Sequence, residues 1–158
     1  MKRIALFILA GLITISVSAR KRLATYQKQV IECLGVEGDG SQTLRVTGTG
    51  HNKTDAKEQA KKDAVAAVIF NGIRSGMGGC DTRPLISEHN ARDKYAEYFN
   101  IFFMDGGEYK KYVSMEDRKR RSDDKSKNKL FKNYRLTIRV LRNELESRLK
   151  EDGVIKNK

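Results

Sequence analysis

The chain has 158 residues, of which 32 are Lys or Arg and 20 are Asp or Glu, so its formal net charge at pH 7 is +12. This length supplies one domain with a single modest core and excludes a large multidomain architecture. The positive charge favours anionic neighbours such as lipid headgroups, lipopolysaccharide, acidic glycans or acidic protein surfaces, although it also fits simple solubility.

The first nineteen residues have the pattern of a secretory signal peptide. A basic start precedes an apolar run over 4–17, and small residues end at Ala19, where a signal peptidase would cut. The run is about sixteen residues long, shorter than the roughly 20 that a spanning helix needs. We therefore expect a periplasmic or secreted protein. The alternative is an uncleaved N-terminal membrane anchor, because the basic residues 20–22 would resist export.

Removal of residues 1–19, which carry two basic residues and no acids, would leave 139 residues with a net charge of +10. We expect an N-terminal linker at 20–28, a single domain at 29–153 and a basic tail at 154–158. The sequence shows no internal repeat and no heptad pattern.

The chain after the linker begins with the pattern of a β-hairpin. Residues 30–34 have strand composition, and the cluster at 37–41 is rich in turn formers. Residues 43–50 alternate between apolar and polar side chains, which is typical of a half-buried strand.

A helix is predicted next, from a cap at Asn52 or Thr54 to about Phe70, with Gly72 ending it. Its apolar stripe consists almost wholly of alanine: Ala56, Ala60, Ala64, Ala67 and Val68. Small side chains let a helix axis approach a sheet closely, so we expect this helix to lie pressed against one.

Residues 71–84 form a loop with four glycines, Cys80 and the single proline, and such long loops are often functional or mobile. A second helix is predicted at about 90–104. Its aromatic side chains indicate core packing: Tyr95, Tyr98, Phe99, Phe102 and Phe103.

Two more strands are predicted at 109–115 and 130–140, and a closing helix carries Leu141, Leu145 and Leu149. Between the strands, residues 116–129 contain no apolar residue. This composition predicts a charged, disordered loop or the tip of a long hairpin. The element order gives the α+β class: an antiparallel sheet of about four strands with two or three helices packed on one face.

The two cysteines favour a disulfide in an oxidising compartment. A Cys33–Cys80 bond would close a loop of roughly 48 residues and contribute about 3–4 kcal/mol. The alternative is two unpaired, buried thiols.

Gly48-Thr49-Gly50 resembles a dinucleotide-binding loop only in part, because Lys53 stands where that pattern needs a third glycine. A weaker hypothesis is that the helix N-terminus, with His51 and Lys53, holds an anionic group. The alternative is that the glycines let the helix pack back over its own strand.

We expect no enzyme, no cofactor and no metal site. Only His51 and His89 are available as histidine ligands or bases, and no spacing brings them together with the cysteines or carboxylates in a known catalytic or metal-binding pattern.

The segment 110–132 holds ten Lys or Arg and four acids, flanked by aromatic residues. Basic and aromatic residues together can bind polyanionic surfaces, although a solvated loop is the alternative and nucleic acid fits the compartment poorly. The candidate interaction residues are Lys110, Lys111, Arg118, Lys119, Arg120 and Arg121.

The strand that ends in Gly-x-Gly at 43–50, the alanine-striped helix, and the strand running into a Leu-x-x-x-Leu helix at 136–149 resemble a bacterial envelope module. They are similar to the N-terminal domain of the flagellar T-protein and to the small twenty-kilodalton lipoprotein family, and the chain also looks like small secreted proteins of Bacteroidetes-type bacteria. The resemblance implies an envelope domain that binds partners and carries no catalytic residues. The Cys80 loop, the aromatic helix and the basic segment depart from it, as does the missing lipoprotein cysteine.

Together these observations predict a non-enzymatic periplasmic protein-interaction module of a cell-envelope assembly, with an envelope protein as its partner. The alternative is a protein that binds an anionic glycan, lipopolysaccharide or lipid headgroups through the basic segment.

Overall fold

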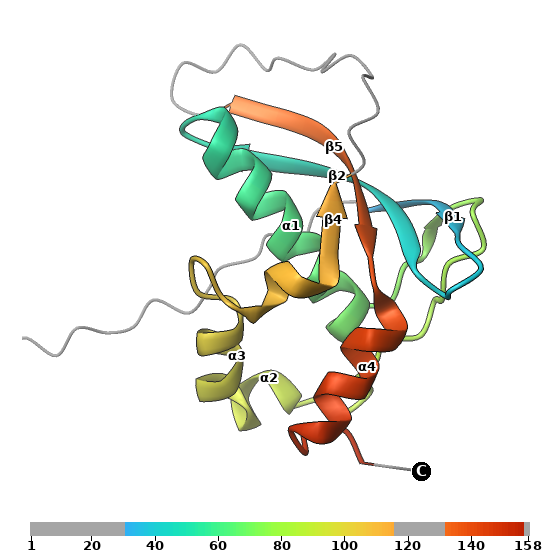
Figure 1. The fold of residues 1–158 in the computed structure, drawn as a ribbon, viewed down its shortest axis with the longest axis vertical. Helices are drawn as coiled ribbons and strands as arrows, with labels where there is room; N and C mark the ends of the chain where they lie inside the picture. Colours follow the sequence, from blue (N-terminus) through green and yellow to red (C-terminus); the bar gives the residue numbers. More distant parts are fainter. Residues whose placement is uncertain (1–30, 116–131, 157–158) are drawn as a thin grey trace, which may run out of the picture.

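The computed structural model describes residues 31–115 and 132–156 (Figure 1). The expected signal peptide with its cleavage at Ala19, the linker at 20–28 and the basic run Arg118–Arg121 lie outside the described residues. The elements are β1 (Glu32–Val36), β2 (Gln42–Gly50), α1 (Lys53–Phe70), β3 (Ser75–Gly76), α2 (Ala91–Lys94), α3 (Ala96–Phe102), the 3-10 helix η1 (Glu108–Tyr112), β4 (Val113–Met115), β5 (Lys132–Val140) and α4 (Arg142–Glu151).

The predicted α+β class is confirmed, with one difference in the sheet. The five strands lie in the order β3-β1-β2-β5-β4, and β1–β2, β2–β5 and β4–β5 are antiparallel. The two-residue strand β3 pairs with β1 in parallel, so the sheet is mixed. The parallel pair arises because the chain crosses over through α1 before it returns to the β1 edge.

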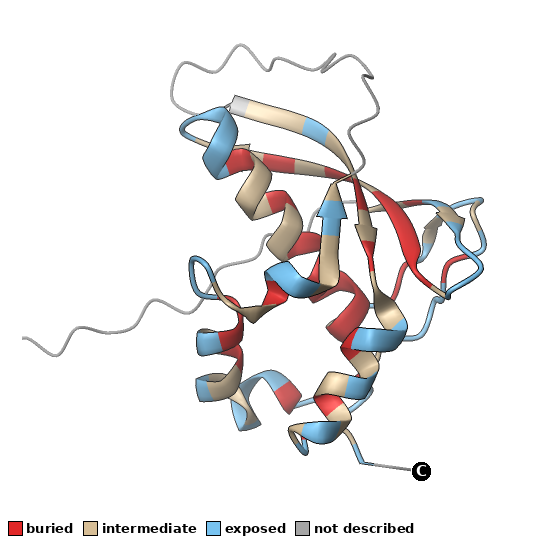
Figure 2. Cartoon of the chain, viewed as in Figure 1, coloured by how far each residue is buried: buried red, intermediate tan, exposed pale blue. Residues whose placement is uncertain are grey.

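Helix α1 lies very close to β2, as the alanine stripe predicts. A Cβ atom on Gly48 would be 1.9 Å from the Ala56 carbonyl oxygen and 2.8 Å from the Ala60 Cβ. Buried residues run along β2 and the second half of α1 (Figure 2). Gly48 and Gly50 therefore let the helix pack back over its own strand, which was the alternative to a ligand-binding loop.

The aromatic helix is broken in two. Tyr95 has φ −109° and ψ 28°, outside the helical region, so α2 ends and α3 begins there instead of one helix spanning 90–104. After the break, Phe99, Phe102 and Phe103 are buried in the core, with the Phe102 and Phe103 rings 5.0 Å apart. The aromatic side chains thus form core, as expected.

The prediction of a strand at 109–115 is wrong for most of these residues. Only Val113–Met115 pairs with β5, and the preceding residues form η1. Tyr109 is fully buried, and its hydroxyl donates a hydrogen bond of 2.8 Å to Glu58 on α1. The 3-10 turn thus carries a buried ring that joins this segment to α1.

Helix α4 closes the domain through buried Leu145 and Leu149, and the packed chain continues past Gly153, since Val154 is also buried. The Tyr98 hydroxyl donates a hydrogen bond of 2.6 Å to Asp152, which joins α3 to the end of α4. Within the two described ranges, no helix is long and apolar enough to cross a membrane.

Candidate interaction surface

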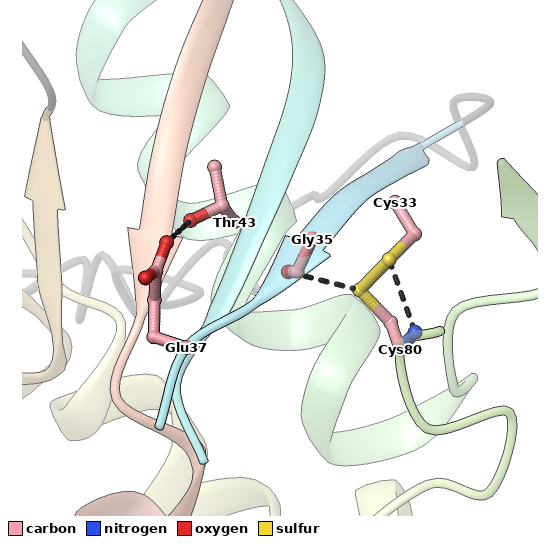
Figure 3. The surroundings of a disulfide bond; sticks show 5 residues. All are labelled: Cys33, Gly35, Glu37, Thr43 and Cys80. Carbon is pink, nitrogen blue, oxygen red and sulfur yellow. Dashed lines mark hydrogen bonds between the residues drawn. A yellow bond between two sulfur atoms is a disulfide. The ribbon is translucent and has the colours of Figure 1, made fainter. Parts of the chain in front are cut away.

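A disulfide between Cys33 and Cys80 fastens the glycine-rich loop to β1 (Figure 3). Both cysteines are buried. The Cys80 backbone N–H donates a hydrogen bond of 3.1 Å to the Cys33 sulfur, and the Cys80 sulfur lies 3.6 Å from the Gly35 carbonyl oxygen. The loop backbone is therefore fixed along the outer edge of β1.

Two glycines of the loop touch the backbone of β1 directly. A Cβ atom on Gly76, whose φ is +96°, would be 2.3 Å from the Cys33 carbonyl oxygen. A Cβ atom on Gly78 would be 2.4 Å from the Gly35 nitrogen. Any side chain at these positions would push the loop away from the strand, so the glycines are required by the close approach.

Met77 stands between these two glycines and is fully exposed, at 103%. It follows Gly76, the last residue of β3, which pairs with Cys33 in β1. Leu34 occupies the β-bulge between the Cys33–Leu44 and Gly35–Thr43 pairs and is 39% exposed; Val36 at the end of β1 is 46% exposed. We call Leu34, Val36 and Met77 the apolar edge.

The apolar edge holds three of the five exposed large hydrophobic residues in the described part of the chain; of the other two, Ile101 is in α3 and Met104 follows it. Exposed apolar side chains gathered in one part of a surface can mark an interaction site. A fixed backbone with apolar side chains directed at solvent can dock into a complementary pocket on a protein.

The turn that continues from β1 is also fixed. The Asp39 carboxylate accepts hydrogen bonds from the backbone and hydroxyl of Ser41, at 2.9 and 2.6 Å, and from the Arg139 guanidinium at 2.6 Å. These bonds hold the pKa of Asp39 below its usual range. The Asn143 side chain donates a hydrogen bond of 2.8 Å to the Asp39 carbonyl oxygen, which ties the turn to α4.

The described residues of the expected basic surface are both ion-paired. Lys110 lies 3.0 Å from Glu58, and Lys111 lies 3.0 Å from Glu108. Lys110 therefore belongs to a contact between η1 and α1, and its charge is compensated there. The remaining four candidates, Arg118–Arg121, lie outside the described residues.

Glu58 is the centre of that contact. Its carboxylate also accepts hydrogen bonds from Lys61 and from the Tyr109 hydroxyl, each 2.8 Å long. Partial burial raises the pKa of Glu58, but the hydrogen bonds from Lys61, Lys110 and Tyr109 outweigh burial and lower the pKa to about 2. The cluster joins α1 to η1 and holds Glu58 as an anion.

A cleft of about 270 Å³ lies beside this cluster. It is lined by Asp55, Glu58, Gln59, Lys62, Asp105, Gly106 and Lys110. Lys62 pairs with Asp105 at 2.7 Å, so the lysines of the cleft already have carboxylate partners. The arrangement supports a structural role more than the binding of a charged ligand.

The hypothesis of an anion site at His51 and Lys53 receives no support from the local geometry. Helix α1 begins at Lys53, and Asn52 caps it by accepting a hydrogen bond of 2.9 Å from the Asp55 N–H. The Asp55 carboxylate, held at 2.9 Å by the Asn52 amide, already places negative charge at the helix N-terminus. The anion site stays a prediction.

Over 31–115 and 132–156, no group of three or more His, Cys, Asp or Glu side chains could hold a metal ion. No protein-family model, curated protein or solved structure matches the chain. The resemblance to the flagellar T-protein domain and the small lipoproteins therefore stays a prediction.

Sequence reasoning singled out the loop at 71–84 and both cysteines, but missed Leu34, Val36 and Met77. A signal for Met77 was present: it is an isolated apolar residue enclosed by Gly76, Gly78 and Gly79. A large apolar side chain among glycines has few neighbours within its own loop to pack against.

Proposed function

We propose that the chain is a non-enzymatic protein-interaction module of a cell-envelope assembly, and that it docks on a protein partner through the apolar edge. The observation that carries the proposal is Met77, fully exposed on a loop that a disulfide and two close-packed glycines hold against β1. The partner's matching feature is an apolar pocket that receives the Met77 side chain.

The energetics of this anchor are favourable. Burial of a methionine side chain contributes about 1.5–3 kcal/mol, and Leu34 and Val36 add further apolar area. Because the loop backbone is already fixed, docking loses little backbone freedom, and preorganisation of this kind raises affinity. An unbranched thioether also adapts to the shape of the pocket that receives it.

The charge of the described residues favours a protein partner over a lipid or glycan surface. Residues 31–115 and 132–156 together contain 18 Lys or Arg and 16 Asp or Glu, which is close to balance. A domain with nearly balanced charge attracts an anionic surface only weakly.

The proposed location is outside the cytoplasm, in the periplasm or secreted. The Cys33–Cys80 disulfide supports this location, because disulfides persist in oxidising compartments and are rare in the cytosol. The signal-peptide pattern of residues 1–19 points the same way.

A second candidate is the binding of an anionic glycan, lipopolysaccharide or lipid headgroups through residues 116–131. The observation that favours it is the distribution of charge: this segment alone holds seven Lys or Arg and four acids, in contrast to the nearly balanced domain. Such binding would weaken steeply as salt rises.

The test is affinity purification of the tagged chain after crosslinking in cells, with Met77→Asp compared with Met104→Asp. Met104 is a matched control because it is also an exposed methionine, at 54%, but lies in the turn that follows α3. We expect one recurrent protein that is lost only with Met77→Asp. Retention of that protein by Met77→Asp would contradict docking through the apolar edge.

The second candidate is tested with vesicles, comparing the wild type with a variant in which Arg118–Arg121 are glutamines. The second candidate predicts that the wild type binds anionic but not neutral vesicles, that salt weakens this binding and that the variant loses it. This result, together with a purification that yields no recurrent protein, would favour the second candidate over the first.

A further inference from the structure

We propose that Met77 is the site at which this chain is oxidised by hydrogen peroxide and related two-electron oxidants, giving methionine sulfoxide. In the step, the thioether sulfur attacks one peroxide oxygen, the O–O bond breaks, an S–O bond forms and water leaves. The sulfur is oxidised and the peroxide is reduced, so no further reactant is needed.

Exposure of the residue distinguishes Met77 from the other described methionines. Met77 is 103% exposed, Met104 is 54% exposed, and Met115 on β4 is only partly exposed. Oxidation follows exposure of the sulfur to the oxidant. The Met77 side chain is therefore the one that peroxide meets with the least hindrance.

The position of the loop keeps the side chain exposed. Gly76 and Gly78 lie against the backbone of β1, and the disulfide at Cys80 fastens the loop just beyond them. With the backbone on both sides of Met77 pressed against the strand, the loop cannot turn the side chain inward without breaking these contacts. Exposure is thus a property of the folded loop.

No thiol competes for the oxidant. The chain has two cysteines, and Cys33 and Cys80 are joined to each other and buried. The oxidant therefore meets methionine sulfur and no free thiol. Among the methionines that the structure describes, Met77 is the most exposed.

Oxidation would change the most exposed residue of the apolar edge. A sulfoxide replaces an apolar, flexible side chain with a polar one. If the apolar edge docks as proposed above, which this consequence requires, the partner's pocket would have to receive an unpaired polar oxygen. We then expect the affinity to fall at least about tenfold.

The modification itself is tested without any partner. The folded protein is treated with hydrogen peroxide alongside N-acetylmethionine amide, quenched at intervals, reduced, digested with trypsin and analysed by mass spectrometry. Met77, Met104 and Met115 fall in three different tryptic peptides. We expect Met77 to oxidise at a rate near that of the free compound and at least about twofold faster than Met104. Equal or faster oxidation of Met104 or Met115 would overturn the assignment.

The consequence is tested separately with Met77→Leu, which keeps the apolar volume but cannot be oxidised. Each protein is compared with its own sample before peroxide, so that the starting affinity of the variant does not matter. We expect the wild type to lose its purified partner after peroxide and to regain it after treatment with methionine sulfoxide reductase and a dithiol reductant, while peroxide causes no loss of the partner that Met77→Leu binds. Equal loss in both proteins would overturn the role of Met77 oxidation in docking. A failure of the proposed docking is detected separately, in the purification described above, where Met77→Asp would then retain the partner.

Discussion

Gly78 lies against the backbone of Gly35, so close that a Cβ atom on Gly78 would be 2.4 Å from the Gly35 nitrogen and 2.5 Å from the Leu34 carbonyl carbon. The contact is between two stretches of main chain, neither of which can rotate aside as a side chain would. The position of the loop, and with it the direction of Met77, is thus set by an approach that only glycine permits.

The first prediction concerns this contact. Gly78→Ala should lower the free energy of unfolding by about 1–3 kcal/mol, because the added methyl group must displace backbone on β1. Gly38→Ala is the matched control, since a Cβ atom there meets no atom within 4 Å. Urea denaturation of both variants measures the difference, and equal stabilities would show that the loop does not depend on this approach.

The second prediction concerns the disulfide. Replacement of Cys33 and Cys80 by serine should cost about 3–4 kcal/mol, because the bond closes a long loop and removes conformational freedom from the unfolded chain. The sequence separation of the two cysteines is 47 residues. Denaturation of wild type with and without a reducing agent provides the comparison, and the serine variant should not respond to the reductant. A loss below about 1 kcal/mol would indicate that the loop is held by packing alone.

The third prediction concerns acid stability. The pKa of Glu58 is lowered from 4.5 to about 2 in the folded protein, so its ionised form stabilises the fold above about pH 4.5, and this contribution is lost as the pH falls toward 2. Glu58→Gln should cost about 1–2 kcal/mol at pH 7 and much less near pH 2, where the wild-type carboxylate also becomes neutral.

The measurement for Glu58 is the free energy of unfolding of wild type and variant between pH 7 and pH 2, with the exposed residue Glu97 changed to Gln as the control. The wild-type and Glu58→Gln curves should converge at low pH, while the control stays parallel to the wild type. A constant gap across the whole range would mean that the ion pairs with Lys61 and Lys110 contribute nothing to stability.

Much of the fold follows from local patterns. The alternation over 43–50 predicted β2, the alanine stripe predicted a helix pressed on a sheet, and Leu145 and Leu149 predicted α4. Each pattern is local, because burial repeats every two residues in a strand and every three or four in a helix. The small residues at Gly48 and Ala56 also indicated where helix and strand would meet.

The remaining features depend on contacts between distant parts of the chain. Tyr109 forms a 3-10 turn because its ring enters the core and its hydroxyl reaches Glu58, which lies 51 residues away. Lys110 is compensated by the same carboxylate. The sequence shows that Lys110 is charged and that Gly78 is small, but the partner of each is fixed only by the tertiary fold.

The apolar edge was hidden for the same reason. Its exposure depends on a parallel pairing between Cys33 and Gly76, which local patterns do not reveal. Leu34 also lies at a β-bulge, which local alternation in the sequence does not reveal.

The most direct test of the central claim places the photo-crosslinking amino acid p-benzoylphenylalanine at position 77, and in a second strain at position 104, and irradiates intact cells. Docking through the apolar edge predicts a discrete crosslinked product with one protein from position 77 and none from position 104. No product from position 77, or the same products from both positions, would contradict it.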